Sequence, residues 1–127
     1  MKNLELQKRA NDVRKGIVTA VHGAKAGHPG GSLSAADIFT FLYFEEMNID
    51  PKNPDMEERD RFVLSKGHTA PGLYSALAYR GYFPVEDLPT CVTWAPICRV
   101  IPASISPAWI CLPDPWDRAF PQQYGMA

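Results

Sequence analysis

Residues 26–37 read AGHPGGSLSAAD, and the rest of the chain is organised around this stretch. Three glycines surround His28 and Pro29, which is typical of a backbone bend that passes close to something else, because glycine tolerates positive φ and carries no Cβ. Ser34 stands three residues before Asp37, as in a helix-capping box. The stretch therefore predicts a helix, a histidine-bearing turn and a second helix.

Helical patterns lie on both sides of this turn. From Leu4 to Ala26, apolar residues recur at spacings of three and four with basic residues between them, which predicts an amphipathic helix. Residues 34–47 are apolar around much of a helical circumference, which is typical of a helix buried on several sides. Residues 48–55 contain two prolines and predict a loop, because proline lacks a backbone donor and disfavours helix for the residue before it.

A second histidine follows a short apolar segment. Residues 61–65, RFVLS, predict a buried parallel strand, and the sequence then leads directly to His68. A helix is expected over 73–80, closed by Gly81, and residues 84–88 have the proline and acids typical of another helix start. A strand, a turn and a helix in this order place His68 where α/β folds bind ligands.

Length and charge limit the class of protein. A chain of 127 residues has room for one domain, and a net charge of −1 gives no electrostatic case for binding nucleic acid or an anionic membrane. No apolar stretch approaches the roughly 20 residues needed to span a bilayer, and no cationic start precedes an apolar run. We therefore expect a cytoplasmic protein that binds neither nucleic acid nor membrane.

The composition of the chain changes near Thr90. All three histidines lie before it, whereas all three cysteines, all three tryptophans and six of the twelve prolines lie after it. From Cys91 to Tyr124 no helical or strand periodicity is sustained. The odd number of cysteines argues against a disulfide framework, and the lack of a Cys-x-x-Cys pair or a nearby histidine argues against zinc. The chain therefore joins two segments of different composition near Thr90.

The motifs GHPGGSLSAADI, MNIDP, RDRFVLSKGH and APGLYSALA occur in the order and spacing of one family. Residues 1–90, which contain them, closely resemble the N-terminal part of transketolase, particularly the form split into two polypeptides. The resemblance implies an α/β thiamine diphosphate-binding fold, a parallel sheet flanked by helices, of which this chain holds an N-terminal fragment only. It also implies thiamine diphosphate and Mg²⁺ as cofactors, a C-terminal subunit carrying the pyrimidine-binding domain, and homodimerisation of the assembly.

The same resemblance implies roles for individual residues. His28 and His68 are the expected catalytic residues, lining the channel above the thiazolium near the hydroxyls of a donor sugar phosphate. His28 is expected to contact substrate, whereas His68 and Gly67 are expected to contact cofactor; no residue of this chain is expected to bind metal. Transfer of a two-carbon ketol unit from a ketose phosphate to an aldose phosphate moves protons near neutral pH, for which imidazole is suited. The cofactor itself stabilises the carbanion.

The tail at 91–124 resembles the family only in another reading frame. Synonymous codons for Cys91 to Gln123, read from the third base of the first codon, can encode RHLGSYLQGHP and GVDMSTGSLGQGIS, which resemble the next transketolase segments. Tryptophan codons have no synonyms, and all three tryptophans fit this frame. Residues 125–127 match the family again as written. We therefore expect one base lost near Thr90 and one gained near Tyr124.

Several alternatives stay open. The written chain lacks the Gly-Asp-Gly and asparagine that bind magnesium and diphosphate in the family, so little or no activity is expected from it alone. A related thiamine enzyme such as deoxyxylulose-phosphate synthase is one rival function. A non-catalytic pseudogene product or interaction fragment is another, and a histidine-only metal site is a more distant third.

Overall fold

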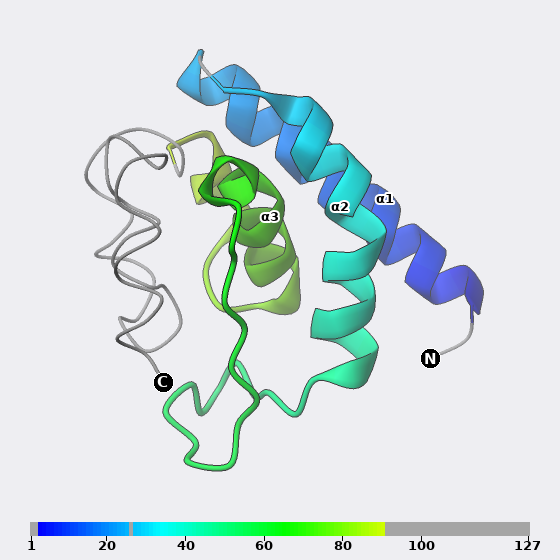
Figure 1. The fold of residues 1–127 in the computed structure, drawn as a ribbon, viewed down its shortest axis with the longest axis vertical. Coiled ribbons are helices and arrows are strands. Elements are labelled where there is room, and N and C mark those ends of the chain that lie inside the picture. The colour runs from blue at the N-terminus through cyan, green and yellow to red at the C-terminus, as the bar shows by residue number, and fades with distance from the viewer. Residues whose placement is uncertain (1–2, 26, 91–127) are drawn as a thin grey trace.

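The computed structural model describes residues 3–25 and 27–90, and the secondary structure of this part is helical (Figure 1). Its α-helices pack against one another and are α1 (Asn3–Ala24), α2 (Pro29–Phe41) and α3 (Ala70–Arg80). The shorter segments are a π-helix at Leu42–Glu46 and 3₁₀ helices at Gly67–Thr69 and Val85–Thr90. The expected out-of-frame tail at 91–124 and the restored frame at 125–127 lie outside the described residues.

Helix α1 confirms the amphipathic helix predicted from Leu4 to Ala26. Its buried residues recur at spacings of three and four, and they are Ala10, Val13, Gly16, Ile17 and Ala20. The helix ends at Ala24, short of the predicted end, because Lys25 (φ 52°) and Gly27 (φ 115°) both take positive φ. Glycine at position 27 therefore allows the chain to turn from α1 into α2.

Helix α2 begins at Pro29, so the predicted start at Ser34 is wrong. Proline suits the first helical position because its φ is already helical and its missing N–H would have no partner there. The Ser34 hydroxyl does not cap the helix; it donates a 2.9 Å hydrogen bond to the carbonyl oxygen of Gly31, one turn earlier. Gly30 and Gly31 are therefore part of the first helical turn rather than of the bend.

The predicted extent of this helix, to residue 47, is confirmed by the π-helix Leu42–Glu46 that continues α2. Arg80 of α3 secures this junction, because its Nε donates a 2.9 Å hydrogen bond to the carbonyl oxygen of Tyr43. The predicted burial on several sides is only partly correct: Ile38 and Phe41 are 62% and 45% exposed. The residues between the π-helix and position 61 form turns and irregular structure, as predicted for 48–55.

The strand predicted at 61–65 is not formed within the described residues. Phe62 packs edge-on against Phe39 and Tyr43 of the α2 region, with ring centroids 5.9 and 5.8 Å away, and Leu64 is buried. The main chain of the segment makes no hydrogen bond to any other described residue. A strand requires a paired neighbour, and none is present in the described ranges. The expected parallel sheet therefore stays a prediction.

Helix α3 confirms the helix predicted at 73–80, with an earlier start at Ala70. Every residue from Ala70 to Ala78 is buried, so α3 is the centre of the helical core. It ends at Gly81, whose φ of 104° is the left-handed closure that the sequence predicted. The 3₁₀ helix that follows confirms the predicted helix start at 84–88 and buries Leu88 completely.

Candidate functional site

His28 lies at the N-cap of α2. Its backbone is extended (φ −119°, ψ 105°), and its side chain makes no capping hydrogen bond to the helix. The residue is exposed, so the imidazole is accessible from solvent. Gly27 on one side and Pro29 on the other fix this geometry through positive φ and a helix-compatible φ, respectively. The sequence correctly predicted a histidine-bearing bend here.

His68 lies in the 3₁₀ turn that leads into α3 and is half-buried. The turn is closed by Thr69, whose backbone N–H and hydroxyl both donate to the carbonyl oxygen of Lys66, at 3.0 and 2.8 Å. Thr69 is fully buried, so it anchors the turn to the core. The predicted turn and helix are present around His68, whereas the predicted preceding strand is not.

The two histidine-bearing segments meet at Gly31. A Cβ on Gly31 would lie 3.1 Å from Cγ2 of Thr69 and 3.6 Å from both Cδ2 and Nε2 of His68. The imidazole of His68 therefore lies against the first turn of α2, which begins immediately after His28. The sequence showed that both histidines occur in glycine-bearing bends, but the contact between the His68 turn and the first turn of α2 is a finding of the structure.

The glycines near the site have different environments. Gly67 begins the 3₁₀ turn that carries His68 and is half-buried. A Cβ on Gly30 would meet nothing within 4 Å, so this position is open, unlike its neighbour Gly31. The first turn of α2 lies against His68, and its N–H groups without intrahelical partners give this region a positive electrostatic character. At the start of α3, in contrast, the N–H groups of Thr69 and Ala70 are bonded to the carbonyl oxygens of Lys66 and Gly67.

The described residues do not offer a metal site. Among residues 3–25 and 27–90, no group of three or more histidine, cysteine, aspartate or glutamate side chains is placed to hold a metal ion. His22, the remaining histidine, is exposed near the end of α1. The prediction that this chain contributes no metal ligand stays a prediction, since it also concerns the tail.

No helix of the described part is long and apolar enough to cross a membrane.

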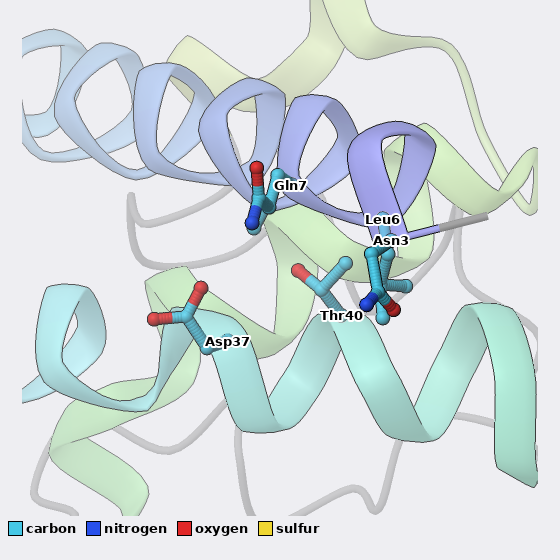
Figure 2. Close-up of a pocket in the computed structure, with 6 residues that line it drawn as sticks. Asn3, Leu6, Gln7, Asp37 and Thr40 are labelled. Atoms are coloured by element: carbon cyan, nitrogen blue, oxygen red, sulfur yellow. The ribbon is translucent and has the colours of Figure 1, made fainter.

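A hollow of about 190 Å³ lies between α1 and α2 (Figure 2), and neither His28 nor His68 lines it. Its lining residues are Asn3, Leu6, Gln7, Ala10, Asp37 and Thr40. Thr40 has its hydroxyl bonded to the carbonyl oxygen of Ala36, at 2.7 Å, and Asp37 forms a 2.6 Å ion pair with Arg14. The ion pair joins the two helices, whereas the Thr40 hydrogen bond lies within α2, so the hollow is a feature of helix packing rather than part of the histidine site.

Comparison with known proteins assigns the chain to a family. Residues 6–102 match the family described as transketolase, thiamine diphosphate binding domain. The 6-deoxy-6-sulfo-D-fructose transketolase subunit of Clostridium sp. (strain MSTE9) is 52% identical over 87 residues, which is 68% of this chain and 32% of the relative. An apulose-4-phosphate transketolase subunit of Phocaeicola vulgatus is 45% identical over 86 residues, covering 68% of this chain and 30% of the relative.

Single-chain transketolases are similar as well. Transketolase 1 of Escherichia coli K12 is 44% identical over 80 residues, which is 62% of this chain and 12% of that protein. The chain thus spans about a third or less of the length of these curated relatives. The match covers the stretches that carry both histidine-bearing bends. This chain belongs to the family of transketolase thiamine diphosphate-binding domains.

Proposed function

We propose that this chain is the N-terminal section of a transketolase that transfers a two-carbon ketol unit from a ketose phosphate to an aldose phosphate. Family membership and the transketolase relatives support the general chemistry. The observation that carries the proposal at the level of residues is the contact of His68 with Gly31, close to His28. Imidazoles at these two positions would suit proton transfer to and from sugar oxygens.

The described residues fit one wall of a thiamine diphosphate site. Gly31 lets the first turn of α2 approach His68 without an intervening Cβ, and the N-terminus of α2 favours an anionic group nearby. The buried Ser32 hydroxyl, which lacks a hydrogen-bond partner, belongs to the core instead: its Cβ lies 3.4 Å from where a Gly72 Cβ would be. The wall therefore consists of imidazoles and backbone.

Each residue of this wall has a distinct task in the proposal. Thiamine diphosphate, when bound, supplies the electron sink that stabilises the carbanion. His28, exposed at the start of α2, contacts a hydroxyl of the sugar and moves its proton. His68, half-buried, contacts the cofactor and substrate from the opposite bend, and Gly67 lets the main chain approach the cofactor.

A complete site requires parts that the described residues do not hold. Mg²⁺ needs oxygen ligands, and no suitable group of acidic side chains exists in residues 3–25 and 27–90. Two of the relatives are named as subunits of transketolases, which supports a partner subunit for this chain too. We therefore propose a C-terminal partner carrying the pyrimidine-binding domain, a homodimer of that assembly, and no activity for the written chain alone.

The experiment is ketol transfer by the assembly, with the reading frame restored and in the presence of the C-terminal partner. Replacing either His28 or His68 by alanine is expected to lower kcat/KM at least about 100-fold, the usual contribution of a proton-transferring group. His22→Ala is the matched control, because it removes an exposed histidine from α1 and is expected to leave the rate unchanged. Undiminished turnover after both replacements would refute the proposed roles.

Two further measurements separate the rival functions. Product analysis distinguishes ketol transfer from the condensation of pyruvate with a triose phosphate that a deoxyxylulose-phosphate synthase performs. Calorimetry of the written chain with thiamine diphosphate and Mg²⁺ is expected to show no binding, and binding would contradict the proposed inactivity. The non-catalytic alternative is favoured by the lack of a metal-ligating group in the described residues, and it predicts no turnover even with the frame restored. Sequencing the DNA near Thr90 and Tyr124 tests the proposed frameshifts.

A further inference from the structure

The side chain of Thr69, directly after His68, is held from two sides. Its hydroxyl donates a 2.8 Å hydrogen bond to the carbonyl oxygen of Lys66, and its Cγ2 lies 3.1 Å from the position that a Gly31 Cβ would occupy. Oγ1 and Cγ2 are both attached to Cβ, so rotation about one bond sets the direction of both. The hydrogen bond to Lys66 therefore also directs the Thr69 methyl group toward α2.

The ring of His68 meets α2 at the same residue. Its Cδ2 and Nε2 lie 3.6 Å from the position of a Gly31 Cβ. The 3₁₀ turn Gly67–Thr69 that carries the ring is closed by backbone hydrogen bonds, but such turns are weakly held because their hydrogen-bond geometry is poor. The Thr69 hydroxyl adds a further bond to this turn, and the Thr69 methyl group separates the turn from α2.

We propose that Thr69 is the positioning residue of His68: its hydroxyl fixes the turn that carries the imidazole, and its methyl group sets the spacing between this turn and α2. Thr69 is fully buried, so it acts through His68 rather than by contact with a substrate. The consequence for catalysis rests on the proposed function. A proton-transferring group must lie within hydrogen-bond reach of the reacting atom, so a small displacement of the ring lowers the rate.

Two substitutions separate the hydroxyl from the methyl group. Thr69→Val keeps the shape of the side chain but removes the donor, and the Lys66 carbonyl oxygen keeps its 3.0 Å bond to the backbone N–H of residue 69. Thr69→Ser keeps the hydroxyl and removes Cγ2. Thr40→Val is the matched control, because Thr40 is also fully buried and donates to a carbonyl oxygen, that of Ala36, at 2.7 Å.

The first measurement is NMR spectroscopy of the full chain. Thr69→Val is expected to shift the imidazole resonances of His68 and to weaken the nuclear Overhauser effect between Gly31 Hα and His68 Hδ2. Thr69→Ser is expected to change both less, because it retains the hydroxyl. Thr40→Val is expected to leave both unchanged, although it also removes a buried hydrogen bond. Equal changes in Thr69→Val and Thr40→Val, or in Thr69→Val and Thr69→Ser, would overturn the role of the hydroxyl.

The second measurement is urea unfolding, and it stays informative if Thr69→Val fails to fold. Gly31→Ala brings a Cβ against Cγ2 of Thr69, but in the Thr69→Ser background this Cγ2 is absent. Gly31→Ala is therefore expected to raise the unfolding equilibrium constant at least about fivefold more in the wild-type background than in the Thr69→Ser background. Equal effects in the two backgrounds would overturn the role of the methyl group.

The third measurement is ketol transfer by the assembly with the frame restored and the C-terminal partner added. Thr69→Val is expected to lower kcat at least about tenfold and to change KM little, and Thr69→Ser is expected to recover most of kcat. Undiminished kcat in Thr69→Val would overturn the catalytic consequence. No transfer by the unsubstituted assembly would contradict the proposed function instead, and the NMR result would still decide whether Thr69 positions His68.

Discussion

Substituting alanine at Gly30 and at Gly31 tests whether the turn bearing His68 packs against the first turn of α2. Both glycines lie in the first turn of α2 and neither has positive φ, so alanine suits the backbone equally at both positions. At Gly30 a Cβ meets nothing within 4 Å, and the replacement is expected to stabilise the chain by about 0.5–1 kcal/mol through reduced backbone entropy. Gly30→Ala therefore measures the gain in stability from reduced backbone entropy without any new side-chain contact.

At Gly31 the same gain is opposed by crowding. The added Cβ would lie 3.1 Å from Cγ2 of Thr69. The Thr69 side chain is fully buried and its hydroxyl is bonded to the Lys66 carbonyl oxygen, so its methyl group has little room to move away from the new Cβ. Overpacking of this kind costs about 1–3 kcal/mol, so Gly31→Ala is expected to be less stable than Gly30→Ala by about that amount. Urea unfolding of the two variants gives this difference directly.

The ring of His68 provides a second readout of the same pair of variants. Gly31→Ala is expected to shift its imidazole resonances in NMR spectra, because the new methyl group would lie in van der Waals contact with the ring, 3.6 Å from Cδ2 and Nε2. Gly30→Ala is expected to leave those resonances unchanged. If the two variants are equally stable and the resonances of His68 are the same in both, the contact of the His68 turn with Gly31 is refuted.

The remaining predictions concern the core that supports the site. Gly81→Ala is expected to cost about 1–2 kcal/mol in urea unfolding, because φ is 104° there and no atom crowds a Cβ; a neutral result would contradict the left-handed closure. Arg80→Met is expected to cost about 1.5–3 kcal/mol by leaving the Tyr43 carbonyl without its donor, whereas exposed Lys8→Met is expected to change stability little. Burial raises the pKa of Tyr43 above its ordinary value, so the folded state keeps this hydroxyl protonated where the unfolded state ionises. The resulting stability is present below about pH 10 and is lost as pH rises further, so Tyr43→Phe is expected to flatten the pH dependence of unfolding above about pH 10, and an unchanged dependence would argue against this assignment.

Local sequence patterns predicted the helices well because their causes are local. The apolar spacing of α1 and the glycine that ends α3 act within a few residues, and both predictions were confirmed. The start of α2 was missed because two signals competed. Ser34 resembles a cap, but Pro29 already satisfies the requirements of the first helical position, and the structure begins the helix there.

Features that depend on distant residues were not predictable in the same way. The segment at 61–65 has the composition of a strand, but a strand also requires a neighbour, and the described residues contain none. The candidate site shows the same limit. The chain's motifs singled out His28 and His68, whereas the contact of His68 with Gly31 depends on how α2 packs beside the turn that precedes α3.

The central structural claim is that the turn bearing His68 packs against the first turn of α2, at Gly31, directly after His28. An NMR measurement of the nuclear Overhauser effect between the Gly31 Hα protons and His68 Hδ2 tests it most directly. A clear cross-peak is predicted, because His68 Cδ2 lies 3.6 Å from the position that a Gly31 Cβ would occupy. Its absence, in spectra where the sequential cross-peaks of both residues are present, would contradict the account.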